Sequence, residues 1–241
     1  MTEWALGPAL AAYHAGVMVI CELAAQFTDD SWDAPTPCPE WRAADLAGHL
    51  RCVADDYSEY LDDAPASRLS RLMATGAEPA SLARKMARQN AAELAALAEG
   101  HGPEHIAAFA ASARAYAQRL PAVWDLPHHY YRGTEVTVAG MAGLACAEWH
   151  LHAWDLACAL GKDYCPANPE LLAAGWQAGM PQLPLGAPLE VAAAGAPRAR
   201  RPGSVVLAGA WPELLRASGL PAPVLPVSGL PGRPARGGTA E

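Results

Sequence analysis

Apolar side chains recur every three or four positions along the first 160 residues, which is the period of a helix and not that of a strand. In the first such stretch, from about Pro8 to Phe27, this spacing places one apolar set on a single face. That set is Leu10, Tyr13, Val17, Cys21 and Ala24. The pattern predicts a helix with one buried face, ended by Asp29 and Asp30.

Proline separates this helix from the next. The segment Trp32–Trp41 has proline at three alternate positions, so it cannot be helical until its last members. Pro39 suits the first position of a helix, where its missing N–H costs nothing. A second helix is therefore predicted over Pro39–Asp62. Its apolar stripe contains Leu46, His49, Leu50, Val53, Tyr57 and Leu61.

Three further helical stretches follow. The pattern predicts them over Ser81–Glu99, over the shorter, alanine-rich Pro103–Leu120, and over Val138–Leu160. Thr137 is the expected N-cap of the last helix, and Gly161 stands where a C-cap glycine adopts a positive φ. Four long helices with one long connection indicate a four-helix bundle, and hence a mainly α fold.

The distribution of proline divides the chain. Nine prolines lie in the first 165 residues and thirteen in the last 76, so we expect the helical part to end near residues 161–166. The expected domains are a metal-binding bundle over 1–165, a small irregular α/β extension over 166–220 and a disordered tail over 221–241. Two β-like pieces, 188–193 and 204–210, are predicted to pair as a hairpin.

Charge and composition exclude some partners. The formal net charge is −8, with 52% hydrophobic and 17% charged residues, and the densest basic cluster is Arg198, Arg200 and Arg201. A protein that binds the phosphate backbone concentrates Lys and Arg on one face, so we expect no nucleic-acid partner. Arg outnumbers Lys 15 to 2, a bias typical of a GC-rich bacterial genome.

The sequence also predicts no membrane segment and a cytoplasmic location. The uncharged run Trp4–Cys21 contains Pro8 and His14 and lacks basic flanks, and the run Leu171–Leu189 contains three prolines. The six cysteines form no CxxC pair, so free thiols in a reducing compartment are expected. The protein is expected to be a monomer or a homodimer.

The candidate chemistry lies in the segment EWHLHAWD, residues 148–155. On a helix, Glu148 and His152 are four residues apart and project from the same face. His49, in the apolar stripe of another helix, would complete three protein ligands, the number that catalytic zinc sites use. A carboxylate and two imidazoles also suit iron, manganese or nickel.

Spacing alone leaves a structural alternative open, because Glu and His at this spacing are often a solvated pair or a capped core histidine. The position of the three residues favours the metal site. All of them lie on otherwise apolar faces, where an uncompensated carboxylate or imidazole would carry a large desolvation cost.

Two segments carry a family resemblance. Trp32 with TPCPEW and ADLAGHL, residues 32–50, and EWHLHAWDLACALG, residues 148–161, closely resemble the mycothiol-dependent maleylpyruvate isomerase family and the wider DinB-like metal-dependent bundles. The resemblance covers roughly residues 8–161. It implies a four-helix bundle with a divalent metal, usually zinc, held by His49, Glu148 and His152. Mycothiol is a thiol of GC-rich actinobacteria, which agrees with the composition.

Other polar residues near these motifs have two interpretations each. Asp155 and Asp45 each lie one turn from a candidate histidine, and each either accepts an imidazole N–H or caps a neighbouring segment. Cys38 precedes a helix N-terminus, which would lower the pKa of its thiol, although a structural role is favoured. Cys52 is expected to serve packing.

Four other histidines lie outside the candidate ligand set. His150 is about 200° from both Glu148 and His152 around the helix, so we expect it on the surface or on a second bundle face, away from the metal. His14 is expected to border the cavity. His128 and His129 lie in an aromatic loop and have no readable role.

These features favour a metal-dependent enzyme that uses a low-molecular-weight thiol, such as mycothiol, on a small electrophilic substrate. The expected reaction is isomerisation or S-transfer, because a zinc-bound thiol is deprotonated near neutral pH and adds to activated double bonds, epoxides or quinones. One alternative is a thiol-independent metal enzyme that tailors a small molecule in biosynthesis. The other is a non-catalytic metal-binding or ligand-binding module.

Overall fold

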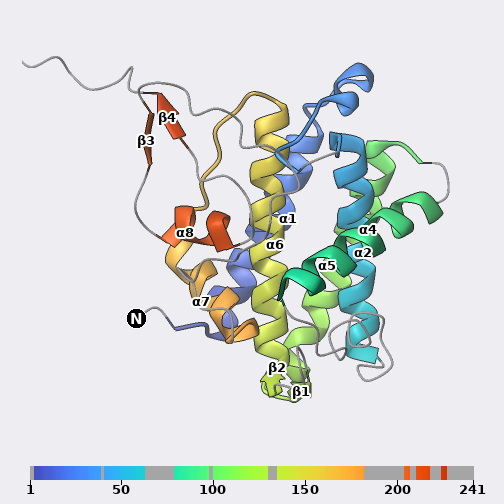
Figure 1. The fold of residues 1–241 in the computed structure, drawn as a ribbon. Helices are drawn as coiled ribbons and strands as arrows, with labels where there is room; N and C mark the ends of the chain where they lie inside the picture. Colours follow the sequence, from blue (N-terminus) through green and yellow to red (C-terminus); the bar gives the residue numbers. More distant parts are fainter. Residues whose placement is uncertain are drawn as a thin grey trace, which may run out of the picture.

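The computed structural model describes residues 3–38, 41–62, 79–97, 100–129, 135–181, 204–206, 210–217 and 224–226. Helices dominate the fold (Figure 1). The helices are α1 (Leu6–Ala24), the 3₁₀ helix η1 (Asp29–Asp33), α2 (Ala43–Asp62), α4 (Pro79–Ala96), α5 (Gly102–Val123), α6 (Val138–Ala159), α7 (Pro169–Gly179) and α8 (Ala210–Ala217). The strands are β1 (Pro127–His129), β2 (Glu135–Thr137), β3 (Ser204–Val206) and β4 (Val224–Pro226).

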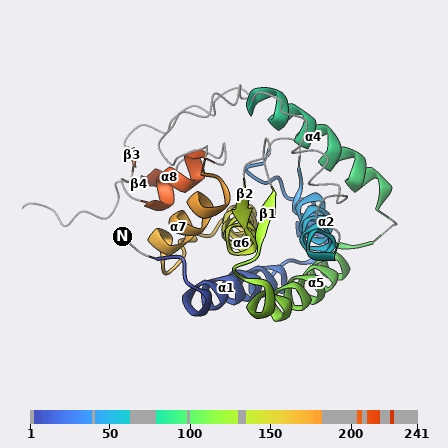
Figure 2. The ribbon, with the colours of Figure 1, turned by 90° about the horizontal axis from the view of Figure 1, so that it is seen from below.

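Four helices form the predicted bundle. α5 packs against α1 and α2, and α6 packs against α1 and α2 from the other side, so the four helices enclose one core (Figure 2). Aromatic rings fill its centre, where Trp149 lies against Tyr13, Tyr57 and Phe109 with ring centroids 4.9 to 6.0 Å apart. The mainly α fold is confirmed.

One helix of the bundle is not the one that the predicted helix lengths suggest: α5 belongs to the bundle and α4 does not. The stretch expected to be short is the 22-residue α5, which buries Ile106, Phe109, Tyr116 and Leu120 in the core. α4 packs against α2 at the edge of the molecule, outside the four helices (Figure 2). Its described side chains, from residue 88 onward, are half-buried or exposed, so this part of α4 places no side chain fully inside the core.

Side-chain caps and a glycine mark the ends of α2 and α6, the two helices that carry the candidate ligands. Asp45 accepts a hydrogen bond from the backbone N–H of Arg42 at 2.8 Å, next to the start of α2. Thr137 accepts one from the N–H of Gly140 at 3.2 Å and is the N-cap of α6, as predicted. Gly161 follows α6 with a φ of +68°, the left-handed conformation that glycine adopts without strain.

The expectation that the helical part ends near residues 161–166 is wrong, because α7 follows and packs directly on α6. Glycines permit this close approach. A Cβ added to Gly143 would lie 2.2 Å from the carbonyl oxygen of Gly175, and one added to Gly140 would lie 2.6 Å from that of Ala178. α7 was hidden in the sequence because its apolar residues occur in an uncharged run interrupted by proline.

The C-terminal strands also differ from prediction. β3 pairs antiparallel with β4, with Val205 opposite Leu225. The first β-like piece, 188–193, lies outside the described residues. β4 falls within residues 221–241, the expected disordered tail, and it gives residues 224–226 of that segment a strand.

Two other predictions concern the cysteines and the absence of a membrane-spanning segment. All six cysteines are free, as expected. Within the described part of the chain, α1 alone has the length and apolar character to cross a membrane. α1 packs against α5 and α6 in this structure, and it buries Tyr13, Val17 and Ile20 in the core.

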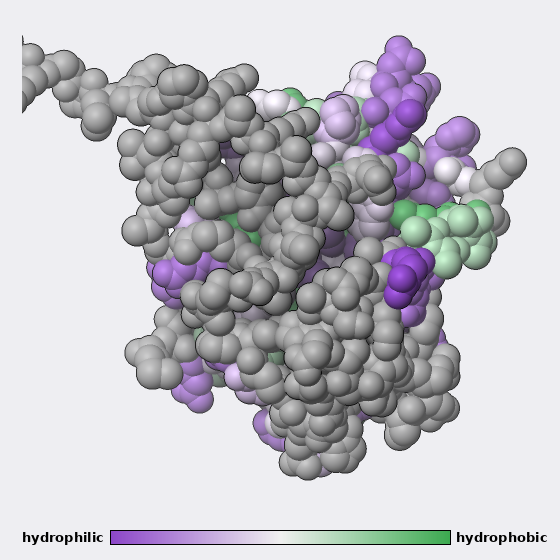
Figure 3. Space-filling view, viewed as in Figure 1, coloured by the Kyte–Doolittle hydropathy of each residue, from purple (hydrophilic) through white to green (hydrophobic). Residues whose placement is uncertain are grey.

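The surface near η1, which carries Asp29, Asp30 and Asp33, is hydrophilic (Figure 3).

Candidate metal centre

The structure brings the three predicted ligands together. Glu148 and His152 project from successive turns of α6 toward α2, where His49 lies, and one donor atom from each residue lies within 4.8 Å of the others. Two ligands of a tetrahedral zinc ion, each about 2.1 Å from it, are about 3.4 Å apart. The three side chains are therefore within a small rotation of a shared ion.

The exposure of these residues suits a catalytic site. His49 is buried, whereas Glu148 and His152 are only half-buried. The side chain of His152 is 13% exposed, and three protein ligands are the number that leaves a fourth position on a catalytic zinc ion for water or substrate.

The partners of the Glu148 carboxyl indicate whether a cation fits between the three residues. Its Oε2 accepts a hydrogen bond of 2.8 Å from the hydroxyl of Tyr57 on α2. Burial raises the pKa of the Glu148 carboxyl, although His152 and Tyr57 act in the opposite direction. Among the residues that the structure describes, no Lys or Arg forms an ion pair with this carboxyl. A divalent cation would supply the missing positive charge, so the donor set fits a metal.

His152 has the neighbour that a metal-binding histidine usually has. Its Nδ1 lies 3.0 Å from Oδ2 of Asp155, a fully buried residue one turn further along α6. Because a carboxylate oxygen only accepts, Nδ1 carries the proton and Nε2 is left as the ligand atom. Of the two interpretations of Asp155, the structure supports the one in which it accepts from His152.

Two neighbouring rings pack against the imidazole of His49. The ring of Trp41, at the start of α2, has its centroid 4.7 Å from that of His49, and the rings of His49 and His152 meet edge to face at 5.2 Å. Trp41 is half-buried and packs on the ring of His49. Packing of this kind fixes the orientation of a ligand before an ion binds.

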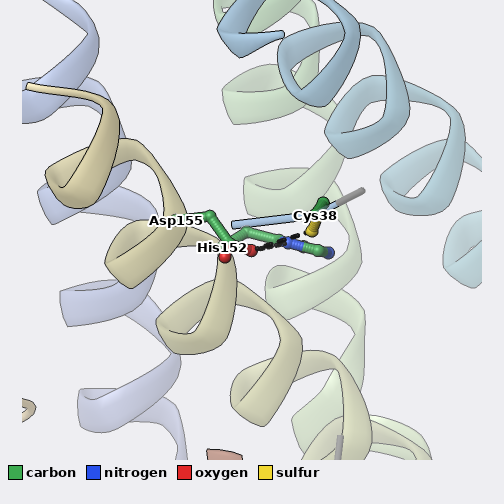
Figure 4. A group of neighbouring side chains, drawn as sticks. All are labelled: Cys38, His152 and Asp155. Carbon is green, nitrogen blue, oxygen red and sulfur yellow. Dashed lines mark hydrogen bonds and ion pairs between the residues drawn. The ribbon is translucent and has the colours of Figure 1, made fainter. Parts of the chain in front are cut away.

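Cys38 lies beside the site, but not as a reactive thiol. Its Sγ donates a hydrogen bond of 3.3 Å to Oδ2 of Asp155 (Figure 4). Burial, with a further contribution from Asp155, raises the pKa of the Cys38 thiol. The expected lowering by a helix N-terminus is not found, because α2 begins only at Ala43, and burial and the neighbouring carboxylate both raise the pKa of this thiol.

His150 lies on a second face of the bundle, as one of the two expected placements has it. It is buried, with Nε2 3.0 Å from the carbonyl oxygen of Ala12 and Nδ1 2.5 Å from the hydroxyl of Tyr164. Gly16 makes room for it, since a Cβ there would lie 3.2 Å from His150 Nε2. The surface alternative is wrong because α1 covers this face of α6.

The remaining candidates lie outside the ligand set. Asp45 caps the start of α2, which decides between its two interpretations. His14 is exposed and lines a hollow of about 350 Å³ with Val17, Met18, Arg114 and Gln118, which lies between α1 and α5 and does not include the metal ligands. His128 stacks on Tyr60 with ring centroids 3.8 Å apart. Cys52 is half-buried, and the side chain of His129 lies outside the described residues.

Tyr57 and Trp41 belong to the site, and sequence reasoning missed both roles. Tyr57 was assigned to the apolar stripe of α2 as a core residue. It lies eight residues after His49, slightly more than two helical turns, so the spacing placed it on the same face as a candidate ligand. That spacing was the available signal. Trp41 stands inside the TPCPEW motif, but nothing in its spacing indicates a contact with His49.

The fold and the site define a helical bundle with a metal-type set of donors between two of its helices. The chain belongs to the family described as the mycothiol maleylpyruvate isomerase N-terminal domain, which matches residues 14–157. The family resemblance seen in the sequence is thus confirmed, and it places the chain in an enzyme family.

Solved structures show the same fold. A crystal structure of the mycothiol-dependent maleylpyruvate isomerase aligns with a TM-score of 0.50 and 12% identity, and a histidine-to-alanine mutant of it aligns with 0.52 and 14%. Each alignment covers 73% of this chain and 70% of the other. A comparison with curated proteins finds no match.

Proposed function

We propose that the chain is a zinc-dependent enzyme that uses a low-molecular-weight thiol, such as mycothiol, to isomerise a small electrophilic substrate or to transfer sulfur to it. The observation that carries this proposal is the convergence of His49, Glu148 and His152, with one donor atom of each within 4.8 Å of the others. Membership of the mycothiol maleylpyruvate isomerase family supports the thiol.

The chemistry that a bound zinc ion supplies is to hold a thiol as its thiolate near neutral pH. The protein's own residues prepare the site for this. Asp155 fixes the His152 tautomer, Trp41 holds the His49 ring, and Tyr57 orients the Glu148 carboxylate. Three protein ligands leave a fourth position on such an ion for the thiol.

The substrate class follows from what a thiol sulfur attacks. Sulfur adds to one carbon of an activated double bond and leaves a single bond about which the substrate rotates. Loss of the sulfur then restores the double bond in its other geometry and returns the thiol, so an isomerisation consumes nothing. Where the sulfur stays attached, a proton adds to the neighbouring carbon and the product is a thioether.

The test uses the zinc-loaded protein with maleylpyruvate, the compound in the names of the structural neighbours, in the presence and absence of mycothiol. We expect turnover only with the thiol. Turnover that is equal without thiol would contradict the proposal in favour of a metal-activated water or carbonyl mechanism. Zinc binding with no turnover of maleylpyruvate or of other activated alkenes, epoxides and quinones would favour a binding module.

A variant separates metal binding from activity. Glu148→Gln, loaded with zinc to full occupancy, should lose most thiol-dependent turnover, since it replaces a negative ligand with a neutral one and changes the nucleophilicity of the bound sulfur. Glu22→Gln is the matched control, because Glu22 is exposed on α1. Glu22→Gln should retain full activity.

A further inference from the structure

One loop contacts His49 directly and His152 through Asp155. This loop, residues 34–38 and 41–43, connects η1 to α2 and carries both Cys38 and Trp41. Its ends are tied together by backbone hydrogen bonds of 3.0 Å from Thr36 N to Trp41 O and from Ala43 N to Ala34 O. Trp41 packs on His49, and Cys38 reaches His152 through Asp155.

Cys38 and His152 both donate to the same oxygen of Asp155. Oδ2 of Asp155 accepts both the S–H of Cys38 at 3.3 Å and the Nδ1–H of His152 at 3.0 Å, and the two bonds meet at Asp155 in Figure 4. The other oxygen, Oδ1, is buried without a hydrogen-bond partner among the described residues. The carboxylate is therefore held in rotation through Oδ2 alone.

We propose that Cys38 is a positioning residue of the metal centre, which holds the Asp155 carboxylate so that His152 keeps its proton on Nδ1 and presents Nε2 to the ion. Without the thiol donor, the carboxylate is free to turn about its Cβ–Cγ bond and to offer Oδ1 or Oδ2 at poorer geometry. The bond to His152 Nδ1 then weakens, and the competing tautomer with its proton on Nε2 gains population. That tautomer has no lone pair to offer the ion.

A competing arrangement uses the same atoms differently. Cys38, His152 and Asp155 themselves offer donor atoms within 4.8 Å of one another and form a second possible group of ligands. An ion held there would displace the protons of both hydrogen bonds at Asp155. The two arrangements exclude each other, and they predict opposite results when sulfur is replaced by a hydroxyl group.

The experiment compares Cys38→Ser, which keeps a donor, with Cys38→Val, which has a similar volume and no donor. Zinc affinity is measured by competition with a chromophoric chelator. Cys38→Val should bind zinc about tenfold more weakly, the lower end of the range for groups that orient ligands, and Cys38→Ser should stay near wild type. Cys21→Val, a half-buried cysteine on α1, is the matched control and should not change zinc affinity.

A second readout needs neither metal nor turnover. In the metal-free protein, the ¹⁵N shifts of the His152 ring, assigned by their loss in His152→Gln, should report the Nδ1–H tautomer in wild type and Cys38→Ser. In Cys38→Val they should report a mixture. Cys38→Ala is a second donor-free variant to be measured in the same way if Cys38→Val does not fold.

Two results would overturn the assignment. Equal loss of zinc affinity in Cys38→Ser and Cys38→Val would show that the thiol is itself a ligand. Wild-type affinity and tautomer in Cys38→Val would show that the contact positions nothing. The inference rests on the metal site of the proposed function, but a failure of thiol-dependent turnover would leave both readouts unchanged, so the two claims fail separately.

Discussion

The hydroxyl of Tyr57 on α2 donates a hydrogen bond of 2.8 Å to Oε2 of Glu148 on α6. This bond joins the two helices that carry the candidate ligands, and it is made by a side chain that is almost wholly buried. It occupies one carboxylate oxygen and leaves the other for an ion. The same contact that orients Glu148 thus also lowers the cost of burying it.

Replacing Tyr57 with Phe should therefore weaken the metal site without dismantling the bundle. The ring still packs against Trp149 and Tyr116, while Glu148 loses its only hydrogen bond to a described side chain. Zinc affinity should fall by about tenfold, as is typical when an outer-shell partner is lost. Competition with a chelator measures the change.

Tyr13→Phe is the control for this variant. Tyr13 is also buried, but its hydroxyl donates to the carbonyl oxygen of Ala113, at 3.1 Å, instead of to a candidate ligand. Its loss should cost about 0.5–1.5 kcal/mol of stability and leave zinc affinity unchanged. If both variants bind zinc equally well, the proposed role of Tyr57 is wrong.

Close packing of α7 on α6 predicts a large effect of a single methyl group. Gly143→Ala would place a Cβ 2.2 Å from the backbone oxygen of Gly175, which no rotamer change relieves. Overpacking of this kind costs about 1–3 kcal/mol, which exceeds the gain of up to about 1 kcal/mol from helix propensity. The melting temperature should fall by several degrees.

Gly7→Ala, in the first turn of α1, provides the contrast, because nothing lies within 4 Å of its added Cβ. Its melting temperature should stay the same or rise slightly. A Gly143→Ala protein as stable as Gly7→Ala would mean that α7 does not pack on α6 in this way.

Stability should also depend on pH through His105, at the start of α5. Burial lowers the pKa of His105 from its ordinary value of 6.5, and Arg51 and His101 add to the lowering, while Glu104 opposes it. The folded protein therefore binds this proton less readily than the unfolded chain. The contribution of His105 to stability is complete above pH 6.5 and is lost as the pH falls through the lowered pKa.

The measurement is urea unfolding of wild type and His105→Gln at pH 7.5 and pH 5. Because Gln does not titrate, the difference in the free energy of unfolding between the two proteins isolates His105. Wild type should lose more stability than His105→Gln between the two pH values. A difference that is constant with pH, or that moves the other way, would contradict the assignment.

The sequence predicted the bundle well because α1, α2 and α5 bury apolar side chains at helical spacing, and because residues that end helices mark the bounds of a helix. α6 is an example: Thr137 and Gly161 marked its ends to within a residue or two. α7 was missed because its buried side chains, Leu171, Leu172 and Trp176, stand at the start of an uncharged run that prolines interrupt further on. The pairing of β3 with β4 was missed because a three-residue strand gains its partner only in three dimensions.

The site was predictable as far as spacing within one helix allows. Glu148 and His152 are four residues apart, so their common face followed from helix geometry. The partners of His152 and Glu148 did not follow with the same certainty. The bond from Cys38 to Asp155 joins residues 117 positions apart, and that from Tyr57 to Glu148 joins residues 91 apart, so both depend on how the helices pack.

The central claim is that His49, Glu148 and His152 hold one divalent ion, and elemental analysis after equilibration with zinc and gel filtration tests it most directly. Wild type should retain about one zinc per chain, and His152→Ala should lose most of it. His14→Ala, which changes an exposed histidine, should retain as much as wild type. A wild-type protein without stoichiometric zinc, or a His152→Ala protein that keeps it, would contradict the assignment of the site.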